Sequence, residues 1–203
     1  HDCYVRINTI GKLVNAVAND KNKIVAPGQF DIHTKKELIC ATALFLLGFS
    51  TIIIPAKWCK MLYPGDLIPT GLIIGGRGAI IHSGIFKRIG LFDEKSLPHY
   101  GADHDFYLRC KKAGVNLFVS RSALVDVDDN RKSYEHNENQ KKTRFMNSLR
   151  NRNSHRNIYD TWTLFSNYYS FSGFAFIGII LYLIRYSTIH FFSLLFHKQG
   201  KQE

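Results

Sequence analysis

Residues 75–119 constrain the fold more than any other part of this chain, because apolar runs, glycine-containing turns and helical patterns alternate there at short intervals. The apolar run 79–81, and the run 72–74 just before this stretch, predict buried strands. Residues 83–89 have helical spacing, and Gly90 ends the pattern. Strands and helices that alternate in this way predict an α/β layered sheet.

An acidic loop and a second helix follow. The helix is predicted to begin near Asp103 and to end at Gly114, with Lys111 and Lys112 in its last turn, where cations complement the helix dipole. A strand is predicted directly afterwards, at 115–120. Carboxylates therefore lie where a loop enters a helix near the rim of the sheet, a usual place for ligands in open α/β folds.

The preceding part of the chain is consistent with the same fold class. Residues 10–17 have helical spacing, and residues 23–26 read as a strand. The apolar stretch 41–54 is too short to span a membrane and is interrupted by Gly48 and Ser50, so it is predicted to form strand and core.

The ordered motifs between residues 75 and 119 resemble the second half of family 2 glycosyltransferases of the GT-A fold, and most of all their rhamnosyltransferase-type branch. That family shows a glycine-rich strand, a GxFDE motif, an acidic pair with Asp, an Arg one to two turns later, and an xxAG turn before a strand. The matching residues here are Gly75-Gly76-Arg77-Gly78, Gly90-Leu91-Phe92-Asp93-Glu94, Leu97-Pro98-His99-Tyr100-Gly101-Ala102-Asp103, His104-Asp105, Arg109 and Lys112-Ala113-Gly114.

The resemblance implies an inverting glycosyl transfer, in which a hexosyl or deoxyhexosyl group moves from a nucleotide sugar to a glycan or lipid-linked acceptor. It implies that Asp103 is the catalytic base, which takes the proton from the acceptor hydroxyl. A place at a helix N-terminus favours the deprotonated carboxylate. The alternative for Asp103 is a simple helix N-cap.

Substrate binding is expected from the residues around this base: Gly76, Arg77, Gly78, Asp93, His99, Asp105 and Arg109. The two glycines allow close backbone approach to a ligand, and they equally serve a tight turn. Arg77 is placed to contact a phosphate. Asp93 is expected to order the acceptor loop. Asp105 precedes Arg109 by four residues, which favours an ion pair on the helix surface over a contact between Arg109 and the donor diphosphate.

The resemblance also implies a divalent cation, Mg or Mn, held by a DxD motif that ends an earlier strand. Residues 1–3 overlie that motif, so Asp2 is the expected metal ligand. The nucleotide-binding half that precedes the motif is expected to lie outside this sequence, in missing N-terminal residues or a partner chain. A second DxD-like run at 126–128 follows the wrong strand for this metal and is predicted to be an acidic turn.

The net charge of +11 and the pI near 9.6 favour anionic partners. The cations are concentrated at 131–156, directly before an aromatic and apolar segment at 162–196. Such a pair of segments favours attachment to the cytoplasmic face of a membrane, with the globular part in the cytoplasm. Nucleic acid is not an expected partner, since only Tyr134 and Phe145 are interleaved with these cations and no nucleic-acid motif is present.

Three structures are open for the segment 162–196. A membrane-spanning helix would carry Arg185 inside the bilayer. An in-plane anchor would keep Arg185 and His190 at the lipid headgroups. The third structure is a pair of soluble helices packed on the sheet domain.

The predicted organisation is therefore a partial GT-A domain at 1–130, a basic linker at 131–161 and a membrane-associating helical tail at 162–203. The four scattered cysteines predict neither a zinc site nor a disulfide framework. The alternative function is a catalytically degenerate, membrane-bound module that binds a glycan or acts as a scaffold.

Overall fold

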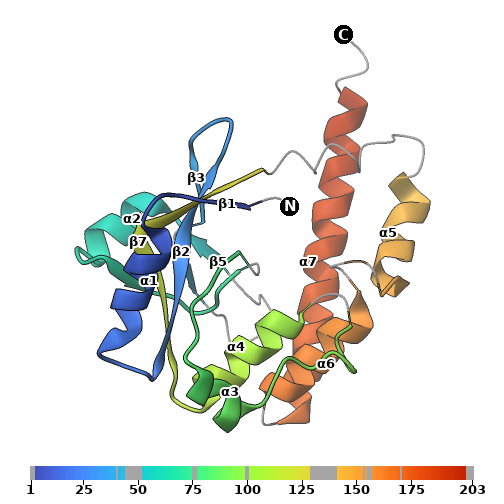
Figure 1. Cartoon of the computed structure of the whole chain (residues 1–203). Coiled ribbons are helices and arrows are strands. Elements are labelled where there is room, and N and C mark those ends of the chain that lie inside the picture. The colour runs from blue at the N-terminus through green and yellow to red at the C-terminus, as the bar shows by residue number, and fades with distance from the viewer. Residues whose placement is uncertain are drawn as a thin grey trace.

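The computed structural model describes residues 3–39, 41–43, 52–74, 77–98, 101–128, 141–152, 154, 157–169 and 171–199. Figure 1 shows a twisted sheet with helices on both faces. The C-terminal helices form a group on the side of the sheet that α4 covers. The predicted fold class, α/β with a C-terminal helical tail, is confirmed.

The main sheet has the order β1-β7-β2-β3, and a further strand, β6, pairs with β7. Its strands are β1 (Cys3–Val5), β2 (Lys23–Asp31), β3 (Glu37–Ile39), β6 (Leu67–Pro69) and β7 (Asn116–Val127). Only β2 and β7 are parallel to one another, and the other pairs are antiparallel. The central strand β2 is buried almost along its whole length, as expected of a strand that is covered on both faces.

The two faces of β2 pack against different helices. Leu13 of α1 (Thr9–Ala18) packs with Val25 on one face, whereas Ile24 and Ala26 belong to the cluster on the other face. Alternate residues of a strand point to opposite faces, which explains this division. The predicted helix at 10–17 is confirmed with slightly wider bounds, and the predicted strand at 23–26 is confirmed but continues to Asp31.

A register shift between Pro27 and Gly28 lets β7 continue past a bulge at 121–123. A Cβ at Gly28 would lie 3.1 Å from both Leu124 Cδ2 and the Ser120 carbonyl oxygen, so the close approach of the two strands favours glycine. The strand predicted at 115–120 is therefore confirmed but extends to Val127. The prediction of an acidic turn at 126–128 is wrong for Asp126, which lies within β7.

A second, two-stranded sheet joins β4 (Ala41–Ala43) and β5 (Ile52–Ile54), followed by the helix α2 (Ala56–Leu62). The strands expected within 41–54 are thus present, and the residues between them lie outside the described part. Beside this sheet, Leu72 and Ile73 are buried as predicted, but they form no strand. The backbone groups of Leu72 bond instead to hydroxyls: its N–H donates to Thr42 Oγ1, and its carbonyl accepts from Thr42 and Thr70.

The run 79–81 also forms no named strand, and Ile80 makes only an isolated antiparallel bridge to Val25. The next two helices, α3 (Ser83–Ile89) and α4 (Ala102–Lys112), match the sequence prediction closely. His82 caps α3, because its Nδ1 accepts a hydrogen bond from the N–H of Gly84. Gly90 follows with a φ of 89°, a conformation that favours glycine.

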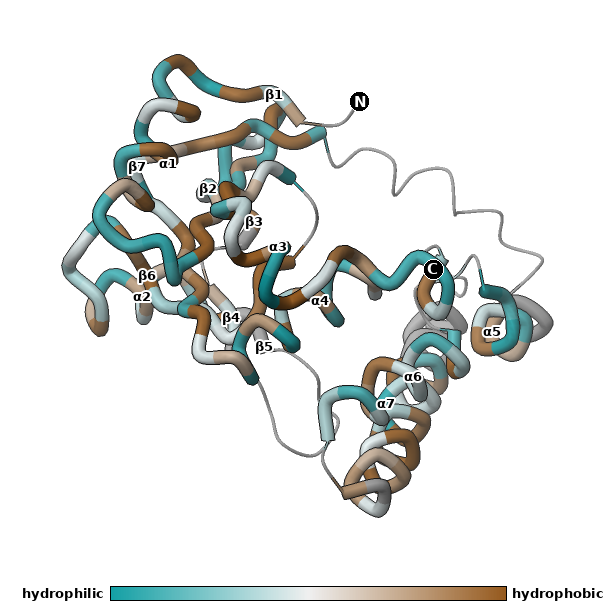
Figure 2. Tube along the Cα trace, turned by 60° about the horizontal axis from the view of Figure 1, so that its bottom comes forward, coloured by the Kyte–Doolittle hydropathy of each residue, from teal (hydrophilic) through white to brown (hydrophobic). Residues whose placement is uncertain are grey.

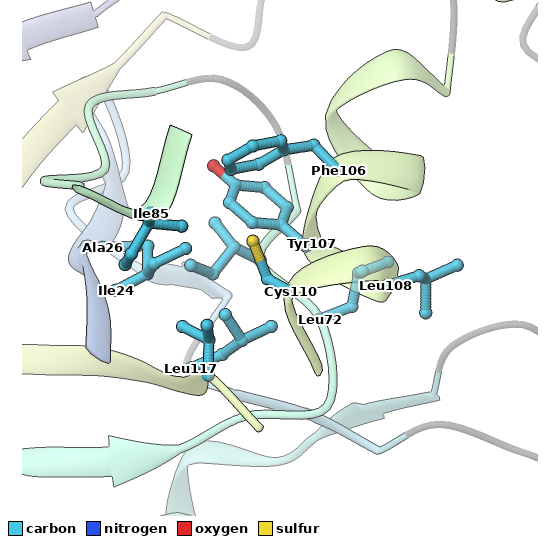
Figure 3. Packing of buried hydrophobic residues seen from close by; sticks show 11 residues of the cluster. Ile24, Ala26, Leu72, Ile85, Phe106, Tyr107, Leu108, Cys110 and Leu117 are labelled. Atoms are coloured by element: carbon cyan, nitrogen blue, oxygen red, sulfur yellow. The ribbon is translucent and has the colours of Figure 1, made fainter. Parts of the chain in front are cut away.

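The largest hydrophobic core lies between α3, α4 and the sheet. Figure 3 shows Phe106, Tyr107 and Cys110 of α4 extending toward Ile24 and Ile85. Burial raises the pKa of the Cys110 thiol to about 11, against the opposing effect of the nearby arginines. The described cysteines, Cys3, Cys59 and Cys110, are free thiols.

Three helices form the C-terminal part: α5 (Lys141–Arg150), α6 (Ile158–Tyr168) and α7 (Ser172–Gln199). They share a hydrophobic core that includes Leu149 of α5, Phe165 of α6 and Ile179 of α7. Figure 2 shows α7 as a long, largely hydrophobic helix beside α6. Because α6 also packs against α4, the expected boundary between residues 161 and 162 falls inside a helix that is docked on the sheet domain.

Candidate functional site

The helix α4 packs on the sheet through the first halves of the parallel strands β2 and β7, because Phe106 and Tyr107 share a core with Ile24, Ala26 and Leu117. A short turn connects α4 to the start of β7 (Figure 1). Asp103 lies one turn before this packed segment, where the preceding loop leads into the helix.

Asp103 lies in the first turn of α4, at the boundary between core and solvent. Gly101 occupies the N-cap position with a φ of 86°, so the interpretation of Asp103 as the N-cap is wrong. The Asp103 carboxylate is half-buried and accepts a hydrogen bond from the N–H of His104 at 2.9 Å. One turn further, the pKa of the buried Tyr107 phenol is raised, mainly by burial and further by the charge of Asp103.

The loop 90–98 is fixed in front of α4 by polar and aromatic contacts. The carboxylate of Asp93 accepts a hydrogen bond from the Ser96 N–H at 2.9 Å, and this contact lowers the pKa of Asp93. The Phe92 ring lies 4.8 Å from that of Phe106, between ring centroids. Leu97 is fully buried. Asp93 thus orders the loop that leads to Asp103.

Arg109 is held by three separate acceptors. Its Nε donates to Asp105 Oδ2 at 2.7 Å, while Nη1 and Nη2 donate to the carbonyls of Ile89 and Leu91, each at 2.8 Å. The ion pair predicted from their spacing is confirmed, but its place on the helix surface is wrong, because the Asp105 side chain is 3% exposed. The guanidinium joins α3, the following loop and α4.

Arg77 lies near the carboxyl end of β2, beside the start of β1. Its Nη1 donates to Gln29 Oε1 at 3.0 Å, and the buried Gln29 amide donates in turn to the carbonyl of Ile74. Burial raises the pKa of the Cys3 thiol, and the charge of Arg77 opposes this effect, so Arg77 and the start of β1 are close in space. Gly78 follows with a φ of 99°, which favours glycine at this turn.

Three of the predicted site residues, Asp2, Gly76 and His99, lie outside the described residues. Within the described part of the chain, no group of three His, Cys, Asp or Glu side chains is arranged to hold a metal ion. The DxD-like carboxylates at 126–128 have other partners: Asp126 pairs with Arg6 at 2.6 Å, and Asp128 pairs with His33 at 3.3 Å. The described residues thus do not fit a metal centre by themselves.

Sequence reasoning missed the polar residues that reach this region from distant parts of the chain. Gln29 supports Arg77 across 48 positions, and Asn167 of α6 donates to Asp105 Oδ1 across 62 positions at 3.2 Å. Arg152 donates to the carbonyl of Ser96 in the loop before α4 at 3.1 Å. No local spacing marks such residues, because folding alone brings them to the site.

No protein-family model matches this chain, and no curated protein matches it. Among solved structures, GalNAc-T7 with UDP, GalNAc and Mn2+ is similar, with a TM-score of 0.49 and 16% sequence identity. The match covers 62% of this chain and 26% of that chain, so the present chain corresponds to about a quarter of that protein.

Proposed function

We propose that this chain is the acceptor side of a glycosyltransferase with a GT-A layout. Together with a donor-binding half that missing N-terminal residues or a partner chain supply, it transfers a hexosyl or deoxyhexosyl group from a nucleotide sugar to a glycan or lipid-linked acceptor, with inversion at the anomeric carbon. One observation carries the proposal: the half-buried Asp103 lies in the first turn of α4, where the preceding loop leads into the helix. This is the position that the sequence resemblance assigns to the base.

Asp103 acts as the general base in this proposal. Its carboxylate accepts the proton of an acceptor hydroxyl while the hydroxyl oxygen forms a bond to the anomeric carbon. The bond between that carbon and the donor phosphate oxygen breaks in the same displacement, and the nucleoside diphosphate leaves. The loop 90–98, fixed by Asp93 and Phe92, forms the wall beside the acceptor.

Arg77 is the proposed contact for the donor phosphates, because the buried Gln29 holds its guanidinium near the carboxyl end of β2. Arg109 is assigned a positioning role, since its Nε, Nη1 and Nη2 groups all donate within the protein. A divalent cation would supply charge stabilisation for the leaving diphosphate. The described residues do not make a site for it, so no step here depends on one.

A transfer assay tests the proposal. Membranes from cells that express the chain together with its donor-binding half are incubated with a panel of UDP-, GDP- and dTDP-linked sugars, and release of the nucleoside diphosphate is measured. Asp103→Asn is expected to lower the rate by at least about a hundredfold, the usual contribution of a general base. Glu94→Gln, which removes an exposed carboxylate from the neighbouring loop, is the matched control and is expected to retain the rate. Equal rates for the wild type and Asp103→Asn would eliminate Asp103 as the base.

A further inference from the structure

An open groove of about 710 Å³ lies between the helices α6 and α7, which are distant from Asp103 in the sequence. Tyr159, Trp162 and Thr163 line it from α6, and Phe176 and Ile179 line it from α7. Their spacing places each set on one side of its helix. The groove is therefore mainly apolar, with three large aromatic side chains, Tyr159, Trp162 and Phe176, that are themselves well exposed.

Arg152 provides the cation that lines this groove. It precedes α6, and its Nη2 donates to both the Ser96 carbonyl at 3.1 Å and Asp160 Oδ1 at 3.2 Å. The side chain is 52% exposed, so part of the guanidinium remains accessible. Arg152 makes its hydrogen bonds to the described residues through Nη2 alone, which leaves the Nε and Nη1 donors for an anion.

The outer face of α7 continues the apolar surface beyond the groove. Its exposed residues are Phe176, Ile177, Ile180, Ile184 and Phe191, whereas Ala175, Ile179 and Tyr182 on the opposite face are buried in the helical core. A helix that is apolar on both faces needs an apolar partner on each. The segment Gly173–Phe191 is also long and apolar enough to cross a membrane, by length and composition.

We propose that the groove between α6 and α7 binds an anionic membrane lipid, with its hydrocarbon chain along Trp162 and Phe176 and its phosphate at Arg152. Hydrocarbon next to a guanidinium matches the chemistry of such a lipid, and aromatic residues with one polar end are typical of the membrane interface. The net charge of +11 attracts the chain to an anionic surface. This inference does not depend on Asp103 or on glycosyl transfer.

The proposed lipid site also adjoins the candidate functional site. Arg152 contacts the Ser96 carbonyl, and Ser96 belongs to the loop that Asp93 orders ahead of α4. A lipid phosphate on Arg152 would thus lie next to the loop that walls the acceptor side. The structure in this way links the membrane contact and the candidate site through one side chain.

Fluorescence of Trp162 tests the proposal, because the chain has two tryptophans and Trp58→Phe leaves Trp162 as the only one. The full chain carrying Trp58→Phe is mixed with vesicles of phosphatidylglycerol or phosphatidylcholine whose acyl chains are brominated near the headgroup. The fluorescence of Trp162 is expected to be quenched by the phosphatidylglycerol vesicles. The measurement is made at about 1 M salt, where the Debye length is about 3 Å and exposed charges are screened. Weaker quenching is expected in phosphatidylcholine.

Two variants in this background separate the groove from a general membrane attachment. Arg152→Gln is expected to weaken phosphatidylglycerol binding about tenfold, because it removes charge-assisted hydrogen bonds. Thr163→Phe fills the groove, leaves Arg152 intact and is expected to abolish the quenching. Arg150→Gln and Thr34→Phe are matched controls at exposed positions that do not line the groove, and they are expected to behave like the parent.

Three results would overturn the proposal. One is co-sedimentation with vesicles without quenching of Trp162, since the outer face of α7 would then make the attachment alone. Another is equal quenching in both lipids, which would remove the role of Arg152. The third is unchanged quenching in Thr163→Phe, with circular dichroism that shows a folded protein.

Discussion

Asp105 in α4 accepts a hydrogen bond from the side chain of Asn167 in α6 at 3.2 Å, and through it the C-terminal helices contact the buried ion pair of the sheet domain. The same helix end makes a second link, because Lys112 donates to the Asn167 carbonyl and lies over the Tyr168 ring. Leu164 and Tyr168 add apolar contacts to the main core. The tail therefore begins with a helix that is part of the sheet domain's packing.

Asp105→Asn is expected to lower the free energy of unfolding by about 3 kcal/mol, because it leaves the partly buried Arg109 charge without its counter-ion. Urea denaturation followed by circular dichroism measures the change. Asp128→Asn is the control, since the pair of Asp128 with His33 is exposed and is expected to contribute less than about 1 kcal/mol. Similar losses in the two variants would contradict the structural role assigned to Asp105.

Stability is expected to fall at acid pH through the pair of Arg6 and Asp126. The Arg6 guanidinium donates two hydrogen bonds to Asp126 and lowers its pKa. A carboxylate whose pKa is lower in the folded state stabilises the fold above its unfolded pKa, about 3.9, and loses that contribution as the pH falls through the folded pKa. Thermal unfolding between about pH 5 and pH 2 is therefore expected to show a smaller pH dependence in Arg6→Gln than in the wild type. Parallel curves would show that this pair contributes nothing.

Two glycine substitutions are expected to have opposite effects. Gly101→Ala places a side chain at a φ of 86° directly before α4 and is expected to destabilise the fold by about 1–2 kcal/mol. Gly11→Ala lies inside α1 with no atom within 4 Å of the added Cβ, and it is expected to stabilise by about 0.5–1 kcal/mol. Chemical denaturation of both variants checks the sign. A neutral Gly101→Ala would mean that the start of α4 is not held in this conformation.

Membrane attachment is expected to depend on the outer face of α7. The double variant Ile180→Glu with Ile184→Glu places two carboxylates on that exposed apolar face and is expected to move the chain from the membrane to the soluble fraction. Met61→Glu, at an exposed apolar position in α2, is the control and is expected to leave the distribution unchanged. Fractionation followed by immunoblotting measures both. Retention of the double variant in membranes would assign the attachment to another segment.

Elements with a strong local pattern were predictable from the sequence. The helix α3 has the predicted bounds, and α4 and β2 lie within a few residues of them. The Asp105–Arg109 pair was equally predictable, because residues four apart on a helix are neighbours whatever the rest of the fold does.

The runs 72–74 and 79–81 show where local pattern was insufficient. Their apolar composition predicted burial correctly for Leu72 and Ile73. At Leu72, however, the hydroxyls of Thr42 and Thr70 make the hydrogen bonds that a strand partner would have made. A buried backbone needs partners for its polar groups, and a ladder is only one source of them. Which source is used depends on residues distant in the sequence.

By itself, therefore, the sequence determined the alternation of strands and helices, the place of Asp103 where a loop enters a helix, and the apolar character of the tail, since each depends on neighbours along the chain. Only the tertiary structure decided that Gly101, and not Asp103, occupies the N-cap position of α4. It likewise decided that Asp105 is buried against Asn167, and that Arg152 lines a groove and contacts Ser96. These relationships join residues far apart in the chain, and the packing of α4, α6 and α7 selects them because buried polar groups must find partners wherever the fold places them.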